Sequence, residues 1–385
     1  MFSKLSKFTL ARAVLTHDVP VYVQFYVTAR CNLTCQQCNI IYANSDVREC
    51  TLDEIKQIAD NFATLKVAII LLTGGEPFAR QDLPEIIQAF TERGIHVRMQ
   101  TNGHASQEQI QKAIEYGGND ISISLDSLRP DAQDHINGGF GKSWHEALRT
   151  IATCTKYLSK TGSFAALGCV LQRANLRDIP EVIRFGSEIG WFTSLVPIHV
   201  TTHSTPMNFR TFDQSLRFTP EEYEAVATLL ATVRQMRRAG ALLYDSDRYL
   251  DDIQRFIIGE PTTWRAKNGG VCDSPNLYFA VLPNGDFAPC CDHRLSAGVQ
   301  TFAPDFPKTF RDRTFRRTVH GVTSACVGCM YGSYPEITIS TRFFAATVQR
   351  VQQFFTSPPP KPWPVSYEAL LSLAENIRRD EAVRA

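Results

Sequence analysis

The sequence VYVQFYVTARCNLTCQQC, residues 21–38, joins an apolar run to three closely spaced cysteines. Residues 21–28 are rich in β-branched and aromatic side chains, which predicts a buried strand. Cys31, Cys35 and Cys38 follow directly, in a loop tight enough to direct three sulfurs towards one point. Three thiolates on a cube-shaped iron–sulfur cluster leave one iron without a protein ligand. A substrate or cofactor can bind at that open iron.

A structural zinc site is the alternative interpretation of these thiols. Such sites normally close with four ligands in paired CxxC or CxxH steps. No Cys or His follows Cys38 at that spacing, because the next thiol along the chain is Cys50. The spacing therefore favours an open iron–sulfur cluster.

Apolar, β-branched runs alternate with helical patterns between residues 21 and 198. The expected strands are residues 21–28, 67–73, 95–101, 120–125, 164–171 and 192–198. The expected helices between them are residues 51–64, 81–92, 106–116, 143–159 and 177–189. Thr51 and Glu54 form a capping box at the first of these helices. Repeated βα units predict a parallel sheet with right-handed crossovers, and six units are too few for a closed eight-stranded barrel.

Chemically useful residues follow the ends of the first four expected strands. They are the three cysteines, then Gly74-Gly75-Glu76-Pro77, then Thr101-Asn102-Gly103, and then Ser124-Leu125-Asp126. The carboxyl ends of parallel strands gather at one edge of the sheet, and sites in such sheets form there. Topology and motif position therefore point to the same site.

CxxxCxxC after a first strand and GGEP after a second resemble the radical S-adenosylmethionine (SAM) enzymes. The resemblance covers about residues 20–335, in several ordered motifs. It implies an α/β fold, a partial (β/α)6 barrel like an incomplete TIM barrel. It also implies a [4Fe–4S] cluster on Cys31, Cys35 and Cys38 whose open iron chelates the amino and carboxyl groups of SAM. One-electron reduction then cleaves SAM to a deoxyadenosyl radical.

The same resemblance assigns SAM contacts to the strand ends. Gly74, Gly75, Glu76 and Pro77 would meet the methionine amino group, with Glu76 orienting the loop. Thr101, Asn102, Ser124 and Asp126 would contact the ribose hydroxyls or the methionine moiety, and Arg173 would pair with the SAM carboxylate. The alternative is that these residues are ordinary caps between strands and helices, and that Arg173 is a surface arginine. Gln37 departs from the family, since an aromatic residue often stands there; Ile40, Ile41 or Tyr42 could pack near the adenine instead.

A second set of cysteines lies downstream. Cys272 precedes an apolar run, 277–282, the turn Pro283-Asn284-Gly285-Asp286 and the pair Cys290-Cys291. Asn-Gly between apolar runs predicts a hairpin, which would bring Cys272 and Cys290 together. Cys326 and Cys329 form a CxxC pair, and four such thiolates can enclose a complete cluster.

This arrangement resembles the twitch domain, the shortened relative of the SPASM domain, of radical SAM dehydrogenases such as 2-deoxy-scyllo-inosamine dehydrogenase. It implies one auxiliary [4Fe–4S] cluster on Cys272, Cys290, Cys326 and Cys329. A zinc ribbon is the alternative, and Cys291 could replace Cys290 as a ligand. Cys50, Cys154 and Cys169 are expected to be small buried side chains, with Cys50 and Cys291 as further candidates for a catalytic thiol.

The expected organisation has four parts. Residues 1–20 form a lead-in helix, 21–245 the partial barrel, 246–335 the small C-terminal cysteine-rich domain of twitch or SPASM type, and 336–385 a helical tail. Further helices are expected at residues 219–239, 246–258, 341–356 and 366–379. A proline-rich spacer, residues 357–364, separates the last two.

Composition restricts the partners. The 385 residues include 40 basic and 39 acidic side chains, a net charge of +1, and no basic patch predicts nucleic-acid binding. Cysteines grouped at ligand spacing, without a secretory signal, indicate a cytoplasmic protein, and no apolar stretch is long enough to span a bilayer. A monomer or homodimer and a reductant such as flavodoxin or ferredoxin are expected.

The resemblance implies that the radical removes hydrogen from a substrate at the barrel mouth, and that the auxiliary cluster accepts the electron left behind. Net oxidation of a small molecule is the expected reaction. Candidate substrate contacts are Asp126, His199, His203, Arg210 and Tyr244. Peptide crosslinking or epimerisation and oxidation of a tetrapyrrole side chain are alternatives, although the few residues before the barrel disfavour a fused leader-peptide domain. A non-enzymatic iron–sulfur or zinc scaffold is the alternative outside the enzyme class.

Overall fold

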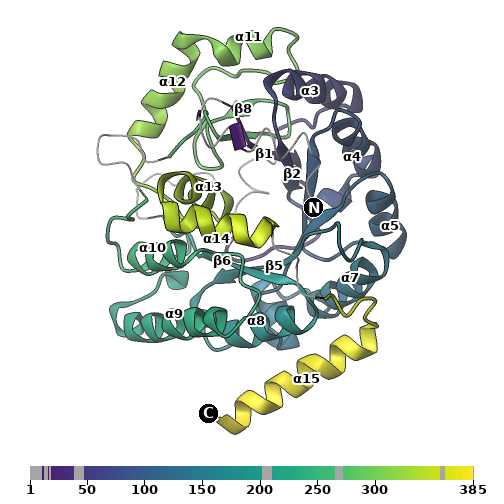
Figure 1. Cartoon of the computed structure of the whole chain (residues 1–385), viewed down its shortest axis with the longest axis vertical. Helices are drawn as coiled ribbons and strands as arrows, with labels where there is room; N and C mark the ends of the chain where they lie inside the picture. The colour runs from purple at the N-terminus through teal and green to yellow at the C-terminus, as the bar shows by residue number, and fades with distance from the viewer. Residues whose placement is uncertain are drawn as a thin grey trace.

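One eight-stranded sheet, in the order β6-β5-β4-β3-β2-β1-β7-β8, runs through the molecule (Figure 1). The computed structural model describes residues 11, 12, 16, 19–38, 47–201, 210–264, 272–355 and 360–384. The first six strands are β1 (Tyr22–Thr28), β2 (Ile69–Gly74), β3 (His96–Thr101), β4 (Asp120–Ser124), β5 (Ala165–Leu171) and β6 (Phe192–Pro197). Each pairs in parallel with its neighbour, which confirms the expected partial barrel.

The expected crossover helices are also present. They are α3 (Leu52–Leu65), α4 (Leu83–Thr91), α5 (Gln107–Glu115), α7 (Ser143–Tyr157) and α8 (Ile179–Glu188). The capping box at α3 is confirmed, because the Thr51 side chain accepts from the Glu54 N–H and the Glu54 carboxylate accepts from the Thr51 N–H. The short helix α6 (Pro130–Ile136) was not predicted. It is mostly polar, and only its residues Gln133 and Ile136 are buried.

The two faces of the sheet differ in polarity. Val23, Phe25 and Val27 of β1 belong to the main core, together with buried side chains of α3 and α4. On β3 the buried Val97 and Met99 alternate with half-buried polar residues, which side-chain alternation places on the opposite face. The inner face of the barrel is therefore polar along β3.

The predicted hairpin of the cysteine-rich region is confirmed, and it extends the barrel's own sheet. β7 (Tyr278–Val281) and β8 (Phe287–Ala288) are antiparallel to each other. β7 also pairs in parallel with β1, with Tyr22 opposite Tyr278 and Phe25 opposite Val281. The strand that leads to the first cysteine loop is thus hydrogen-bonded to the hairpin between Cys272 and Cys290.

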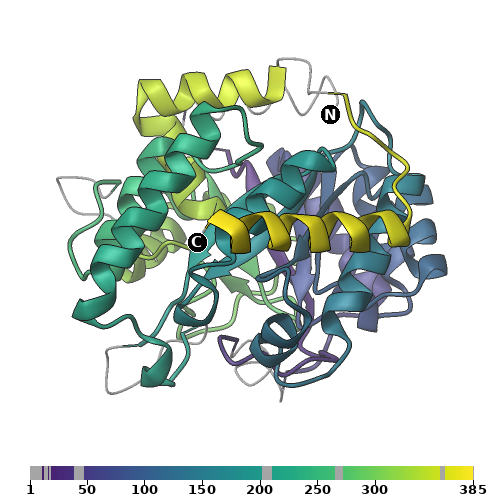
Figure 2. The same cartoon turned by 90° about the horizontal axis from the view of Figure 1, so that it is seen from below.

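Helices of the C-terminal half surround the open side of the sheet. They are α9 (Tyr223–Arg238), α10 (Asp247–Ile257), α11 (Phe306–Arg311), α12 (Arg313–Ser324), α13 (Ser333–Arg342), α14 (Phe344–Phe355) and α15 (Tyr367–Arg384). The sequence predicted α9, α10, α14 and α15 but missed α11, α12 and α13. α15 packs across α7 and α8, as Figure 2 shows.

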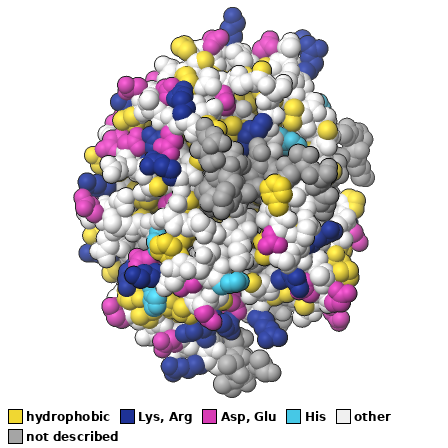
Figure 3. Space-filling model, turned by 180° about the vertical axis from the view of Figure 1, so that it is seen from behind, with side chains coloured by type: hydrophobic (Ala, Val, Ile, Leu, Met, Phe, Trp, Pro, Cys, Tyr) yellow, Lys and Arg dark blue, Asp and Glu magenta, His cyan; other side chains and the backbone are white. Residues whose placement is uncertain are grey.

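Acidic and basic side chains are interspersed over the face of the molecule in Figure 3, in keeping with the balanced composition. Among the described residues, no helix is long and apolar enough to cross a membrane. The expected lead-in helix falls mainly outside the described residues, of which only 11, 12 and 16 in that range are helical.

Candidate functional site

The first three cysteines lie immediately after β1, where the sequence placed them. The loop is held by two short contacts: the Cys38 N–H donates to the Cys35 carbonyl at 3.2 Å, and the Leu33 N–H donates to the Cys31 sulfur at 3.4 Å. Burial raises the pKa of Cys35, and the neighbouring charges of Cys38, Asp126 and Cys31 raise it further. The three thiols thus lie in one hydrogen-bonded loop at the end of β1.

Gly74 and Gly75 pack closely against the backbone that leads into this loop. The Gly75 N–H donates to the Thr28 carbonyl, and the Glu76 N–H donates to the Arg30 carbonyl, both at 2.8 Å. A Cβ atom on Gly74 would lie 2.3 Å from the Thr28 oxygen, and one on Gly75 would lie 2.2 Å from the Arg30 oxygen. The sequence analysis attributed these glycines to the approach of a ligand. The structure shows that the close neighbour is the chain itself.

Glu76 connects the GGEP loop to the end of β3. Its buried carboxylate accepts hydrogen bonds from the Phe78 N–H at 3.1 Å, the Thr101 hydroxyl at 2.8 Å and the Asn102 N–H at 2.7 Å. Burial raises the pKa of Glu76 to about 7, although these hydrogen bonds act in the opposite direction. Pro77 is buried at the start of the short helical turn that follows. Thr101 is itself buried and bound to Glu76, so it positions the loop instead of offering its hydroxyl to a ribose.

Asn102 reaches the cysteine loop directly. Its side-chain amide donates to the Asn32 carbonyl oxygen at 2.7 Å and lies 3.7 Å from the Cys31 sulfur. The Asn32 amide donates in turn to the His104 carbonyl at 3.3 Å. The ends of β1, β2 and β3 thus form one hydrogen-bonded assembly around the three thiols.

Asp126 lies just beyond the end of β4, buried beside this assembly. One carboxylate oxygen accepts from the Val170 N–H at 2.6 Å, and the Asp126 carbonyl accepts from the Asn175 side chain at 3.0 Å. Burial raises the pKa of Asp126 to about 7. Ser124 is the last residue of β4 and is half-buried, opposite Gly168 of β5. Both residues lie at the C-terminal end of β4, as the sequence predicts.

Arg173 is placed differently from the expectation. Its guanidinium forms an ion pair with Glu222 at 2.7 Å and donates to the Ser215 carbonyl at 2.8 Å. The carboxylate that it binds in the structure is that of Glu222, so the predicted pairing with SAM is not supported. An intramolecular ion pair with a residue 49 positions away cannot be read from local sequence.

The second set of cysteines is brought together by the hairpin and the CxxC loop. Burial raises the pKa of Cys272 to about 12, and the charges of Cys290 and Cys326 also act to raise it. Burial also raises the pKa of Cys329, followed by the charges of Cys326, Asp292 and Cys290. The four predicted thiols therefore share one neighbourhood. Among the described residues, no group of three or more His, Cys, Asp or Glu side chains is arranged to hold a single metal ion.

Cys291 differs from Cys290 in its surroundings. It is 3% exposed in an apolar cluster with Tyr22, Tyr26 and Tyr334. A hydrogen bond from the Cys291 thiol lowers the pKa of Cys290, whereas burial raises that of Cys291. Cys290 is the less buried of the two thiols, and its role as the ligand stays a prediction.

Arg210 and His199 were predicted to contact substrate, and the structure shows both in contact with the loop of the second cysteine set. Buried Arg210 pairs with Asp292 at 3.2 Å and donates to the Gly328 carbonyl at 2.9 Å, between Cys326 and Cys329. The His199 ring accepts from the Met330 N–H at 2.9 Å and stacks on Tyr331 at 3.7 Å between ring centroids. Burial and the nearby Arg210 charge lower the pKa of His199, so the ring is neutral. Both residues hold the auxiliary cysteine loop; His203 lies outside the described residues.

A short bridge connects the two sets of cysteines. The Thr211 N–H donates to the His199 carbonyl at 3.0 Å, and the Thr201 N–H donates to the Thr211 carbonyl at 3.1 Å. The Thr211 hydroxyl donates to the carbonyl of Gln36, between Cys35 and Cys38, at 3.4 Å. Its neighbour Arg210 holds the other set. Sequence reasoning missed Thr211 and Asp292, although Asp292 directly follows Cys290-Cys291.

Tyr244 lies away from both sets, against two arginines. The Arg350 guanidinium is 4.0 Å and that of Arg98 5.7 Å from the Tyr244 ring centroid. These contacts hold α14 to the barrel, so a substrate contact by Tyr244 is not supported.

Residues 25–186 match the family described as the Radical SAM superfamily. A Fe-coproporphyrin III synthase of Methanosarcina barkeri is 34% identical over 170 residues, 43% of this chain and 40% of that protein. An AdoMet-dependent heme synthase of Nitratidesulfovibrio vulgaris is 29% identical over 325 residues, 80% of this chain and 84% of that protein. A PqqA peptide cyclase of Ruegeria pomeroyi is 30% identical over 178 residues, 46% of each chain. Several curated relatives are thus matched over less than half of their length.

The fold has solved counterparts. The crystal structure of Streptococcus suis SuiB bound to precursor peptide SuiA matches with a TM-score of 0.60 at 15% identity, over 82% of this chain and 70% of that one. At that identity the likeness shows the fold alone. It agrees with the parallel sheet and helices described above.

The donor sets suit the cofactors that the family match implies. Three thiols at one sheet edge leave an open coordination position, and four further thiols share one neighbourhood. The family match implies a [4Fe–4S] cluster and SAM, and these donor sets suit such cofactors. Residues 25–186 of this chain are thus similar to the Radical SAM superfamily.

Proposed function

We propose that this chain is a radical SAM enzyme that oxidises its substrate by two electrons. Cys31, Cys35 and Cys38 would hold a [4Fe–4S] cluster that, with SAM and one electron from a reductant, would supply a radical able to remove one hydrogen atom from the substrate. The substrate would then lose one further electron and one proton. Cys272, Cys290, Cys326 and Cys329 would hold an auxiliary cluster that would supply the acceptor for that electron.

The chain's own residues orient this chemistry. Gly74 and Gly75 let the GGEP backbone approach the first cysteine loop, and Glu76 fixes the Asn102 loop beside it. We assign Asn102 to the SAM side of the thiols, because its amide already reaches Cys31. Asp126, buried near Cys35 with a raised pKa, is the candidate to hold a proton at the site.

The bridge between the cysteine sets is the observation that carries the proposal. Thr211 contacts the loop of the first set, and Arg210 contacts that of the second. Two adjacent residues therefore span the distance between the candidate centres. A path this short supports electron transfer out of the substrate, and a scaffold protein would have no need for it.

The substrate is proposed to be a small molecule, with an iron tetrapyrrole as the first to test. The match to a heme synthase extends over 80% of this chain, and another relative is named for Fe-coproporphyrin III. A peptide is the second candidate. It is supported by the match to a PqqA peptide cyclase and by the fold shared with SuiB, which was crystallised with its precursor peptide.

Anaerobic reconstitution tests the cofactor assignment. Two complete clusters would give roughly eight irons and eight sulfides per chain, and dithionite with SAM should yield deoxyadenosine. Cys35→Ala should abolish deoxyadenosine formation, while Cys154→Ala, a buried thiol of α7 outside both sets, should retain it. Zinc in place of iron, or no deoxyadenosine from the loaded protein, would refute the proposal.

A second experiment separates oxidation from SAM cleavage. Cys326→Ala should reduce the iron content by about half and still form deoxyadenosine, but it should no longer release oxidised substrate. Fe-coproporphyrin III carrying deuterium on its propionate side chains is the first probe. Deuterium transfer into deoxyadenosine would identify it as a substrate, and the absence of transfer would direct the search to peptides.

A further inference from the structure

α11 and α12 form a basic surface that the balanced composition of the chain conceals. Residues 306–324 contain five basic side chains, Lys308, Arg311, Arg313, Arg316 and Arg317, and a single acidic one, Asp312. The whole chain has 40 basic and 39 acidic residues. This patch is not evident from the sequence, because the net charge of the whole chain is near zero and the two helices were not predicted.

The charges of this surface are available to a partner. All five basic side chains are exposed except Arg316, which is half-buried. Within the described part of the chain, none of them forms an ion pair with a carboxylate. Arg311 donates to the Thr64 carbonyl and Arg316 to the Asn276 side chain, which are neutral groups. The Asp312 carboxylate accepts from the Thr314 and Phe315 N–H groups at the start of α12.

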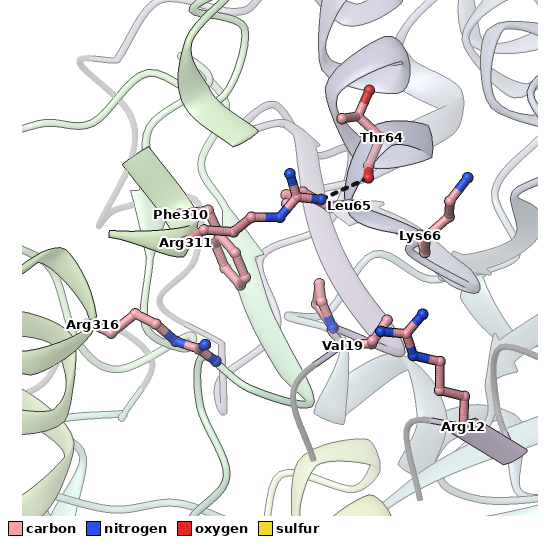
Figure 4. Close-up of a pocket in the computed structure, with 9 residues that line it drawn as sticks. Arg12, Val19, Thr64, Leu65, Lys66, Phe310, Arg311 and Arg316 are labelled. Carbon is pink, nitrogen blue, oxygen red and sulfur yellow. Dashed lines mark hydrogen bonds between the residues drawn. The ribbon is translucent and has the colours of Figure 1, made fainter. Parts of the chain in front are cut away.

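A pocket of about 320 Å³ continues the surface inward. Figure 4 shows Arg12, Lys66, Arg311 and Arg316 around it, with Val19, Leu65 and Phe310 contributing apolar area. None of the described residues that line it is acidic. A carboxylate side chain of a partner would meet positive charge on several sides in this hollow.

The surface lies directly over the polypeptide that holds the second cysteine set. The Cys326 N–H donates to the carbonyl of Thr323, in the last turn of α12, at 3.2 Å. Arg316 contacts Asn276, four residues after Cys272. The ring of Phe315 packs on Phe287 of β8 at 5.1 Å between centroids, so α11 and α12 cover the β8 end of the sheet (Figure 1).

We propose that the α11–α12 surface and its pocket dock an acidic one-electron carrier protein, of the flavodoxin or ferredoxin type. This inference rests on the proposed function, since it assigns the carrier to the auxiliary centre. With an auxiliary cluster held by the second cysteine set, the electron that the substrate loses would reduce the docked carrier by one electron, and the substrate proton would leave to solvent. No covalent bond forms with the carrier.

Physical principles favour such an encounter at this place. Redox partners associate through small, transient interfaces in which charge complementarity steers the approach. The surface is positive, compact and next to the electron's exit. Its interaction should weaken with salt, because exposed charges are screened over about 8 Å at physiological ionic strength.

The test measures binding of oxidised flavodoxin to the anaerobically loaded full-length protein by isothermal titration calorimetry. The double variant Arg313→Glu/Arg317→Glu reverses two exposed charges that form no ion pair. Its control is Arg238→Glu/Lys160→Glu, which makes the same change in net charge on other exposed surfaces. We expect the first variant to weaken binding by about tenfold or more at low salt and the control to change it by less than about twofold.

Several results would overturn the inference. They are equal weakening by both variants, salt-independent binding, no flavodoxin binding by the unaltered protein, and tighter binding of an RNA oligonucleotide than of flavodoxin. Dithionite-driven deoxyadenosine formation in the same samples tests the proposed function separately. A variant that loses flavodoxin affinity but keeps that reaction supports both; a protein that binds flavodoxin but never cleaves SAM retains the docking surface and loses the proposed function.

Discussion

The missing side chain of Gly75 has a direct structural consequence at the scale of one residue. Any Cβ atom there would lie 2.2 Å from the Arg30 carbonyl oxygen, next to Cys31. Gly75→Ala should therefore displace the first cysteine loop. The protein should then bind roughly half as much iron as the parent protein, because one of two cubane sites is lost. Iron analysis and the yield of deoxyadenosine measure the effect.

Gly321→Ala is the matched control for that substitution. A Cβ atom at Gly321, in α12, meets no other group within 4 Å. Alanine there should stabilise the helix by up to about 1 kcal/mol and leave the iron content unchanged. Full iron loading in Gly75→Ala would mean that the loop tolerates displacement and that the glycine is not required.

Asp245 gives a prediction for the pH dependence of stability. It is fully buried, accepting from the Ser194 hydroxyl at 2.8 Å and the Leu195 N–H at 2.6 Å, and burial raises its pKa to about 7. Between about pH 4 and pH 7 the folded protein therefore binds more protons than the unfolded chain at this residue. The free energy of unfolding accordingly falls as the pH rises through that range.

Asp245→Asn should reduce this loss of stability. Asparagine can accept from Leu195 and donate to Ser194, and it does not titrate. We expect the fall in thermal midpoint between about pH 5 and about pH 8 to be smaller in the variant than in the parent protein. Differential scanning fluorimetry measures it, and parallel curves for the two proteins would contradict the assignment.

At the scale of elements, the bridge formed by residues 199–201 and 210–211 depends on one buried ion pair. Replacing Arg210 by Met would leave the Asp292 carboxylate buried beside Cys290 and Cys291 without its partner. Removing one member of a buried pair typically costs about 3–5 kcal/mol. Arg210→Met should therefore lower the thermal midpoint and reduce iron at the second set of cysteines, leaving the first set loaded.

Arg210→Lys is the informative comparison. Lysine keeps the charge but cannot bind Asp292 and the Gly328 carbonyl in the same forked geometry, so partial rescue is expected. If Arg210→Met retained all of its iron and formed product normally, the pair would have no role in holding the auxiliary cysteines. A selective loss of substrate turnover with full iron would favour the original prediction of a substrate contact.

Elements differed in how far the sequence could predict them. Strands β1, β2 and β5 carry apolar runs because they are largely buried, whereas β3, β4 and β6 alternate apolar and polar residues. The hairpin is marked by Asn284-Gly285. α6 and α12 have few buried residues, and only Val319 and Thr323 are buried in α12. A helix stabilised mainly by its neighbours leaves little apolar periodicity, so these two were missed.

At the scale of the whole molecule, the C-terminal segment is anchored by Trp363. It is 2% exposed, donates from its ring to the Ile189 carbonyl at 2.8 Å and packs with Leu370 and Ile377 of α15. Trp363→Ala should cost about 3–5 kcal/mol, since a large buried ring is replaced by a cavity. The packing of α15 on α7 and α8 should then weaken, and limited proteolysis should cut this segment faster than in the parent protein.

Phe344→Ala provides the control for that experiment. Phe344 is 84% exposed, so its truncation should change stability by no more than about 0.5 kcal/mol. Equal protease resistance in Trp363→Ala and the parent protein would mean that α15 is held by other contacts. The sequence predicted only a stiff proline-rich spacer here, because packing on Ile189 is a contact across 174 positions.

The candidate site was predictable to the extent that its chemistry is local in sequence. The three cysteines, GGEP and the CxxC pair are short motifs, and the first two follow β1 and β2 as the sequence predicts. The intramolecular partners of Arg173, His199 and Arg210 were not predicted, because tertiary contacts decide which groups a side chain meets. Arg210 finds Asp292 across 82 positions, and no spacing rule announces such a pair.

The pairing of β7 with β1 has a consequence for how this molecule can change. β1 runs into the first cysteine loop, and β7 lies between Cys272 and Cys290. A hinge between the two cysteine sets would have to break this ladder. Under the proposed function, the distance that an electron crosses between the two centres would therefore stay the same from one turnover to the next.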